Sequence, residues 1–83
     1  MAFEFSKHVL EELERRQIPR SAVEMVLAAP AQKVPEHGDV VCYQGMVNIN
    51  QKDYLLRVMV NETRRVIVTV YRTSKVLKYW SQK

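Results

Sequence analysis

The sequence has little cysteine and little glycine, and it has no long apolar run. Its single cysteine, Cys42, cannot form an internal disulfide, which agrees with a reducing compartment. No apolar run approaches the length of a transmembrane helix, and residues 1–10 contain no signal-peptide apolar region. We therefore expect a cytoplasmic protein with no membrane partner.

Motifs of the common enzyme classes are missing as well. The chain contains two glycines and has no phosphate-cradling glycine loop, no nucleophile elbow and no dinucleotide fingerprint. No pair of Cys or His has metal-ligand spacing, and the Asp and Glu residues are scattered. We therefore predict neither a metal site nor a cofactor.

Acidic residues are absent from residues 64–83, where six Lys or Arg occur. Residues 1–31 hold four basic and five acidic side chains (−1), whereas residues 32–83 hold nine basic and four acidic ones (+5). Aromatic side chains are interleaved with the cations of the final segment, namely Tyr71, Arg72, Lys75, Lys78, Tyr79 and Trp80. Cations neutralise phosphates and aromatic faces stack on bases, so this segment favours contact with single-stranded RNA. A solvated basic edge with an aromatic helix anchor is the ordinary alternative.

Two helices are predicted at the N-terminus of a single domain that spans residues 1–83. The first follows Ser6, which is a suitable N-cap, and has apolar residues at helical spacing until residue 16. The second starts at Pro19 and is stopped by Pro30. Together these helices form an αα-hairpin.

From Val40 onward, β-branched and aromatic residues replace the helical pattern. Residues 31–39 contain Pro35 and are expected to form a loop with at most one short edge strand. The predicted strands, separated by polar turn signals that include Gln44-Gly45, are Val40–Tyr43, Met46–Ile49, Tyr54–Val60 and Arg65–Arg72. The predicted fold is α+β, with the αα-hairpin on one face of a three- to four-stranded antiparallel sheet. A short C-terminal helix capped by Ser74 completes the chain.

The alternation of residues in the last two strands decides which side chains share a face. The even-numbered apolar residues of 54–60 suit cover by the helices, which turns Arg57 to the opposite face. The valines at 66, 68 and 70 are expected to share a face. If the two valine-rich faces coincide, Arg57 lies beside Tyr71; a register slip of one residue would place it beside Arg72 instead.

Polar residues of the first helix could carry acid–base chemistry. His8, Glu12 and Arg16 recur at every fourth position and so form one stripe. A carboxylate one turn from an imidazole can orient it, although an ordinary helix ion pair explains the same spacing. Cleaving RNA without a metal requires a base, cations and an acid. Cations could come from Arg57, Arg72 and Lys75, and a proton from Tyr71 or His8.

The segments KHVLEELERRQIP, VLAAP, YLLRVMV and VIVTVYRTSKVLKYW together resemble a domain-of-unknown-function family of small bacterial proteins. That family is related to the RelE and BrnT toxins of type II toxin-antitoxin modules, and the likeness spans Phe5 to Trp80. The resemblance implies a RelE-like fold and a metal-independent endoribonuclease that cuts mRNA, free or on the ribosome. It also implies a cognate antitoxin that holds the enzyme inactive.

The resemblance also assigns roles to residues. In RelE-like toxins, sheet-borne cations and a tyrosine near the C-terminus cleave the RNA, and Arg57 and Tyr71 fit these positions. His8 and Arg16 match the helix-one positions of the family. The predicted catalytic residues are His8, Arg16, Arg57 and Tyr71, and the predicted RNA contacts are Arg72, Lys75, Lys78 and Tyr79. Unlike RelE, the chain has a net acidic EELERR segment on its first helix, which leaves ribosome dependence open.

A function of a different class is the alternative. The domain could be a non-catalytic module whose sheet edge or apolar groove binds a protein segment, or whose basic C-terminal segment binds nucleic acid. Such a module would bind without turning over RNA. The oligomeric state stays open in both readings.

Overall fold

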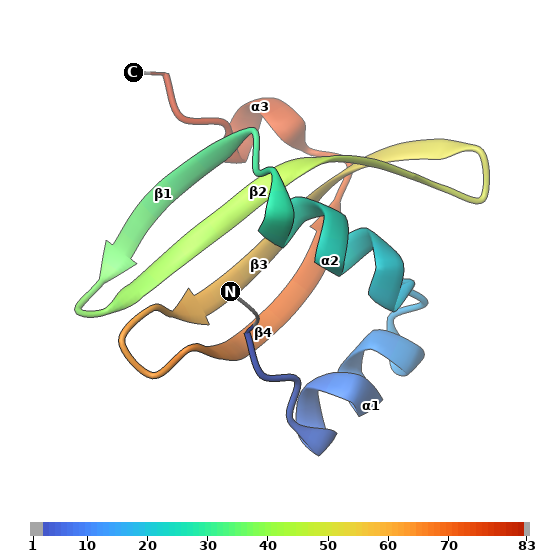
Figure 1. Ribbon diagram of the computed structural model, residues 1–83. Coiled ribbons are helices and arrows are strands. Elements are labelled where there is room, and N and C mark those ends of the chain that lie inside the picture. Colours follow the sequence, from blue (N-terminus) through green and yellow to red (C-terminus); the bar gives the residue numbers. More distant parts are fainter. Residues whose placement is uncertain (1–2, 83) are drawn as a thin grey trace.

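The computed structural model describes residues 3–82, within which lie three helices and four strands (Figure 1). In chain order they are α1 (Lys7–Arg15), α2 (Arg20–Ala28), β1 (Gln32–His37), β2 (Val40–Ile49), β3 (Lys52–Asn61), β4 (Val66–Thr73) and α3 (Val76–Tyr79). The strands form one antiparallel sheet in the order β1-β2-β3-β4. The predicted α+β class is therefore confirmed.

Both N-terminal helices lie where the sequence predicts them. The side chain of Ser6 accepts a hydrogen bond from the amide of Val9 at 3.1 Å, which satisfies one of the free donors at the start of α1. Pro19 is the N-cap residue of α2, just outside the first turn. Between the helices, Gln17 has a positive φ of 57°, which ends α1 and turns the chain.

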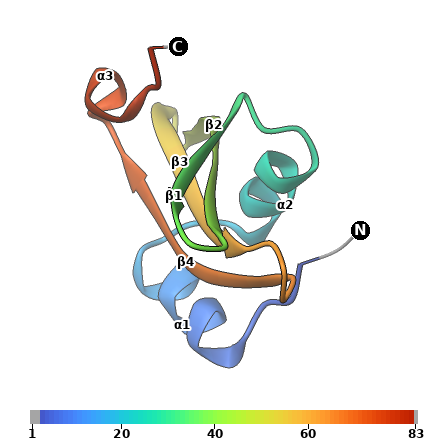
Figure 2. The same ribbon diagram turned by 90° about the vertical axis from the view of Figure 1, so that its left-hand side faces the viewer.

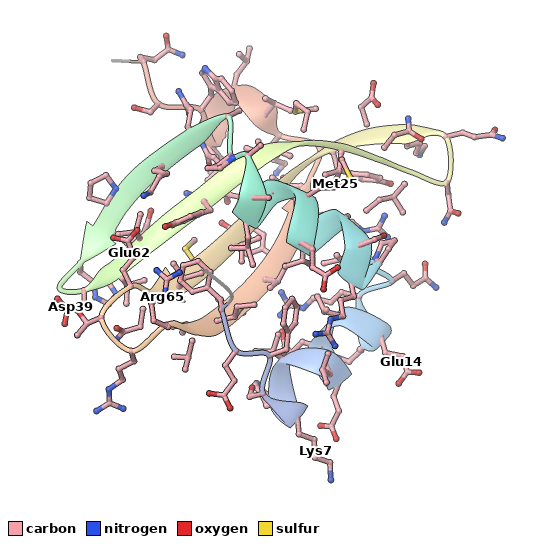
Figure 3. All side chains as sticks on the ribbon, viewed as in Figure 1. Lys7, Glu14, Met25, Asp39, Glu62 and Arg65 are labelled. Carbon is pink, nitrogen blue, oxygen red and sulfur yellow. The ribbon has the colours of Figure 1, made fainter. Side chains whose placement is uncertain are left out.

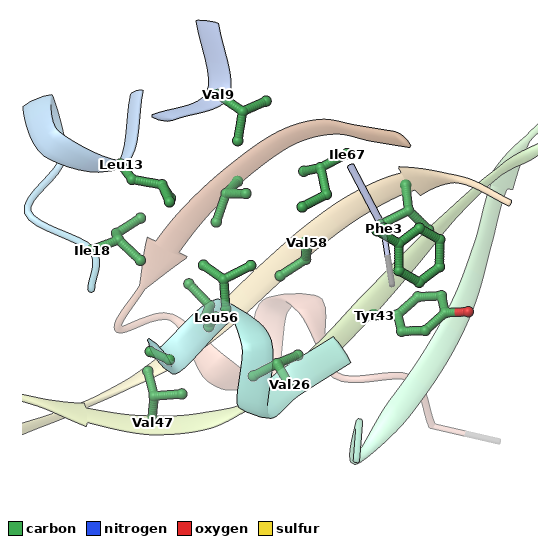
Figure 4. Packing of buried hydrophobic residues seen from close by; sticks show 14 of the residues in the cluster. Phe3, Val9, Leu13, Ile18, Val26, Tyr43, Val47, Leu56, Val58 and Ile67 are labelled. Atoms are coloured by element: carbon green, nitrogen blue, oxygen red, sulfur yellow. The ribbon is translucent and has the colours of Figure 1, made fainter. Parts of the chain in front are cut away.

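Helices α1 and α2 pack on one face of the sheet, α1 against β4 and α2 against β2 and β3. The core between these layers contains Val9 and Leu13 of α1, Val23 and Val26 of α2, and Leu56, Val58 and Val60 of β3 (Figure 4). Figure 2 shows α3 on the opposite side of the sheet from α2. The even-numbered residues of β3 thus face the helices as predicted, and the odd-numbered ones face α3.

Strand β2 corrects one boundary of the predicted meander. Gln44-Gly45 was expected to separate two strands, but both residues lie inside the continuous strand Val40–Ile49. The Gln44 side chain is fully buried and hydrogen-bonded across the sheet. A Cβ on Gly45 would lie 3.7 Å from the Cγ2 of Val26, an ordinary van der Waals contact, so this part of β2 lies directly against α2.

Strand β1 occupies the segment for which a loop with at most one short edge strand was expected. It pairs with β2 from Gln32↔Gln44 to His37↔Val40, with an irregularity between Pro35 and His37. Pro35 is tolerated because β1 is an edge strand, where a missing amide donor costs no internal ladder bond.

The predicted grouping of the three β4 valines is wrong because β4 contains a bulge. Met59 pairs with Thr69 and Val60 pairs with Ile67, which leaves Val68 as an extra residue. The bulge turns Ile67 into the core, where 4% of its surface is exposed, and turns Val68 outward, with 46% exposed.

The C-terminal helix is shorter than predicted. It covers Val76–Tyr79 with Lys75 as N-cap, and Ser74 does not cap it. The hydroxyl of Thr73 accepts a hydrogen bond from the Lys75 amide at 3.0 Å instead. Leu77 is 83% exposed, so the expected apolar side of this helix is only partly buried. Within residues 3–82, no helix is long and apolar enough to cross a membrane.

Because of the bulge, truncation of two neighbouring residues should have unequal effects on stability. Ile67→Ala should lower the free energy of unfolding by about 2–5 kcal/mol because it leaves a cavity in the core. Val68→Ala should change it by less than about 0.5 kcal/mol because the side chain lies in solvent. Urea denaturation of both variants measures the difference. Equal costs, or a larger cost at Val68, would contradict the bulge.

Candidate functional site

Arg57 lies at the centre of the sheet, on the face that α3 partly covers. Its cross-strand neighbours are Tyr71 on β4 and Gln44 on β2. Of the two registers considered from the sequence, the structure has the one that joins Arg57 to Tyr71. Arg72 pairs with Leu56 and therefore faces the other side of the sheet.

The guanidinium of Arg57 is buried and bonded through each of its nitrogen atoms. Nε donates to Oε1 of Gln44 at 2.8 Å, Nη1 donates to the hydroxyl of Tyr71, and Nη2 lies 3.4 Å from a carboxylate oxygen of Glu36. Only 7% of the Arg57 side chain is exposed. A buried cation requires such partners, because burial without them is strongly unfavourable.

The charge of Arg57 is maintained by these partners. Burial on its own disfavours the cation, but the hydrogen bond to Tyr71 and the nearby charge of Glu36 leave the pKa of Arg57 raised above its ordinary value. The guanidinium is therefore protonated at any physiological pH. It supplies a fixed positive charge directly beside the Tyr71 hydroxyl.

Aromatic rings enclose this cation from the α3 side. The guanidinium carbon lies 4.6 Å from the ring centroid of Tyr79 and 5.6 Å from that of Tyr71. The two rings contact each other edge to face, with centroids 6.1 Å apart. We call Glu36, Gln44, Arg57, Tyr71 and Tyr79 the Arg57 cluster.

Glutamine side chains connect the cluster to the C-terminal segment. Nε2 of Gln44 donates to the carbonyl of Tyr79 at 3.2 Å and to Oε1 of Gln32 at 2.8 Å. Gln32 also donates to the carbonyl of Ser81 and accepts from its amide. The segment after β4 thus crosses the sheet face and is held at β1.

The sequence did not predict Glu36 or Gln44 as parts of this cluster, or Gln32 as its link to the C-terminal segment. Gln44 was assigned to a turn, and Glu36 to a loop. Had residues 40–49 been taken as one strand, alternation would have placed Gln44 on the same face as Cys42 and opposite Tyr43. Cys42 is fully buried, and burial raises the pKa of its thiol, which argues against a nucleophilic role.

His8 and Arg16, both predicted to be catalytic, lie apart from the Arg57 cluster. Arg16 donates to the backbone carbonyl of Val70 at 3.0 Å and forms an ion pair with Glu12 at 3.2 Å. His8 lies 3.8 Å from Glu12 and is mostly exposed. Among residues 3–82, no hydrogen bond or ion pair joins either side chain to the cluster. The geometry fits the helix ion pair that the sequence left as an alternative, and here it fastens α1 to the edge of β4.

The four predicted RNA contacts divide between the two faces of the sheet. Arg72 stacks on the ring of Tyr54 at 4.5 Å, on the side of α1 and α2. Lys75 and Lys78 are exposed around α3, and Lys78 lies 5.3 Å from the Tyr79 ring. The α3 side therefore presents Lys75, Lys78 and Tyr79 next to the cluster, without Arg72. No group of His, Cys, Asp and Glu within residues 3–82 could hold a metal ion.

Residues 5–72 match the family described as a domain of unknown function, DUF4258. The chain belongs to the DUF4258 family. The matched part of this DUF4258 domain includes Arg57 and Tyr71, whereas Lys75, Lys78 and Tyr79 follow it. No curated protein and no solved structure matches the chain.

Removing the Tyr71 hydroxyl tests how strongly the cluster stabilises the DUF4258 domain. Tyr71→Phe leaves Nη1 of Arg57 without its acceptor and should lower the free energy of unfolding by about 1–3 kcal/mol. Tyr54→Phe is the matched control, because the Tyr54 hydroxyl forms no hydrogen bond within residues 3–82 and its ring would still stack on Arg72. Urea denaturation should show a clearly lower free energy of unfolding only for Tyr71→Phe. Equal stabilities of the two variants would mean that the hydrogen bond contributes nothing.

The ion pairs of Glu12 predict a pH dependence of stability. The hydrogen bond from Arg15 is the main cause that lowers the pKa of Glu12 below its ordinary value of 4.5, with Arg16 adding to it against the effect of burial. A lowered folded-state pKa gives stability that is complete above 4.5 and is lost as the pH falls through the folded-state value. Glu12→Gln should therefore destabilise the protein at neutral pH and progressively less below 4.5.

Urea midpoints measured at neutral and acid pH test this dependence. The control is Glu14→Gln, since Glu14 is an exposed neighbour on α1 (Figure 3) and forms no ion pair within residues 3–82. If Glu12→Gln lowers the urea midpoint by the same amount at neutral and acid pH, the ion pairs are excluded as the cause.

Proposed function

We propose that this DUF4258 domain has a RelE-like fold and is the toxin of a type II toxin-antitoxin module. In this proposal it acts in the cytoplasm as a metal-independent endoribonuclease on mRNA, and a cognate antitoxin protein neutralises it. The observation that carries the proposal is the hydrogen-bonded pair of Arg57 and Tyr71, on the sheet face that also presents the basic α3 segment.

The pair suits the acid step of RNA cleavage. In metal-free cleavage the ribose 2′-hydroxyl loses its proton to a solvent water molecule and its oxygen attacks phosphorus. A 2′,3′-cyclic phosphate forms, and the bond from phosphorus to the 5′-oxygen breaks as that oxygen receives a proton. The Tyr71 hydroxyl accepts a hydrogen bond from Arg57, so its own proton stays available for donation to the leaving oxygen. The Arg57 cation would stabilise the tyrosinate that remains.

The burial of Arg57 defines its role in the proposal. Because its guanidinium is enclosed and fully bonded, Arg57 acts through Tyr71 and not by direct contact with the scissile phosphate. Lys75 and Lys78 are the exposed cations that would bind phosphates, and the ring of Tyr79 would stack on a base. His8 and Arg16 have no part in the proposed reaction. Arg16 is bound to the Val70 carbonyl and to Glu12, and His8 lies beside Glu12 on α1, apart from the Arg57 cluster.

A second candidate function is favoured by the same burial. If the Arg57 cluster serves only to hold the C-terminal segment on the sheet, the domain is a non-catalytic binding module. In that case the three hydrogen bonds of the Arg57 guanidinium and the Tyr79 ring over it have a structural role alone. Such a domain would bind nucleic acid or a partner protein without turnover.

Cleavage of mRNA by the purified protein, in the presence of a chelator and with or without ribosomes, separates the two functions. We expect cleavage that Tyr71→Phe slows by about 10²–10⁴-fold, which is the usual contribution of a general acid. Tyr54→Phe should cleave like the unmodified protein, and both variants should fold. Intact mRNA under all conditions would refute the proposal, as would equal rates for the two variants.

A further inference from the structure

Part of strand β2 has an open outer edge. β1 pairs with β2 only over residues 40–44, whereas β2 itself continues to Ile49 alongside β3. Figure 1 shows β2 and β3 extending as a hairpin beyond the start of β1. Within residues 3–82, the segment 45–49 therefore has a strand on one side and none on the other.

The direction of the backbone groups along this edge follows from one hydrogen bond. The amide of Ala31 donates to the carbonyl of Gln44 at 3.0 Å, so the backbone of Gln44 faces the side where β1 lies. Backbone groups alternate along a strand, so those of Met46 and Asn48 face the same, uncovered side. An amide and a carbonyl at each residue are thus available to a further strand.

The other sheet edge is protected against such pairing. At the start of β4, the amide of Glu4 donates to Arg65 and its carbonyl accepts from Ile67. Further along, Arg16 occupies the carbonyl of Val70, and the bulge at Val68 interrupts the strand. Bulges, covering segments and side-chain contacts are the usual protection of edge strands. The open part of β2 lacks them.

An apolar groove of about 170 Å³ lies beside the open edge, on the α2 side. Its lining residues are Met25, Val26, Ala29, Ala31, Gly45, Met46 and Val47. Met25 is 67% exposed although it is a large apolar residue, and Figure 3 shows it on α2 next to the β2–β3 hairpin. Because Gly45 has no side chain, the groove reaches the backbone of β2, where an incoming strand could insert an apolar side chain.

The net charge of the chain favours an acidic occupant over a second copy. Near the groove, Glu24 forms an ion pair with Arg20, and the carboxylate of Asp53 accepts a hydrogen bond from the side-chain amide of Asn48. Lys52 pairs with Ile49 at the end of the open edge, and it forms no ion pair within the described chain. The whole chain carries a net charge of +4, which repels a second copy and attracts an acidic segment.

We propose that the outer edge of β2 from Gly45 to Ile49 binds an extended acidic segment of another protein as an added strand. An apolar side chain of that segment fills the groove between α2 and β2. A helix could fill the groove but could not pair with the backbone of Met46 and Asn48, so an extended segment is the occupant that satisfies both features. The proposal does not depend on RNA cleavage, because no residue of the Arg57 cluster lies on this edge.

A capped seven-residue peptide in which Val or Leu alternates with Asp or Glu is the probe. On titration into the full chain, amide exchange should slow at Met46 and Asn48, the two residues whose amides face outward. Met46→Pro removes one of these donors and no sheet hydrogen bond, so it should weaken binding about tenfold while the fold is kept. A peptide with Lys in place of the acidic residues should bind more weakly.

A second pair of variants tests the groove without altering the β2 backbone. Met25→Gln should weaken peptide binding, whereas Leu77→Gln, at another exposed apolar residue, on α3, should leave it unchanged. The proposal is overturned if the peptide does not slow exchange at Met46 and Asn48, or if Met46→Pro and Met25→Gln bind as tightly as the unmodified chain. Slowed exchange that depends on protein concentration without peptide would assign the edge to a second copy and also overturn it. RNA cleavage by Met46→Pro and Met25→Gln should not change, so a failure here is distinct from a failure of the ribonuclease proposal.

Discussion

Burial of the Arg57 charge is the constraint on which one whole side of this domain depends. The guanidinium can remain inside only if each of its nitrogen atoms finds an acceptor, and those acceptors come from β1, β2 and β4. Gln44, which accepts from Arg57, also holds the carbonyl of Tyr79, and so the end of α3. The contacts of Arg57 therefore depend on the register of all three strand pairs. Through Gln44 they also fix where the C-terminal segment lies.

The sequence predicts the elements well because local patterns determine them. Ser6 and the two prolines, Pro19 and Pro30, bound the helices, and the alternation of Leu56, Val58 and Val60 identifies the covered face of β3. The bulge at Val68 could not be predicted, since a bulge depends on how β4 fits between β3 and α1 and leaves the residue pattern unchanged. Gln44-Gly45 has the composition of a turn for a similar reason. A buried glutamine needs hydrogen-bond partners, and those of Gln44 come from distant parts of the fold: Gln32, Arg57 and the carbonyl of Tyr79.

In the candidate site, too, some residues could be predicted from local patterns and others could not. Arg57 and Tyr71 could be selected from the sequence because a cation and a tyrosine on neighbouring strands have two possible registers, one of which joins them. His8 and Arg16 were selected by their spacing on one helix, but spacing along a helix does not reveal what the helix packs against. In the structure Arg16 is bound to the Val70 carbonyl, on the strand that also carries Tyr71. The edge strand thus supports α1 through its backbone and the candidate site through a side chain.

The chemical nature of the RNA ends produced by the purified protein tests the central claim most directly. If the Arg57–Tyr71 pair catalyses metal-free cleavage, incubation of mRNA with the protein and a chelator should yield 2′,3′-cyclic phosphate ends and 5′-hydroxyl ends. Mass spectrometry of the fragments identifies these groups. RNA that stays intact, or fragments with 3′-hydroxyl and 5′-phosphate ends, would contradict the account.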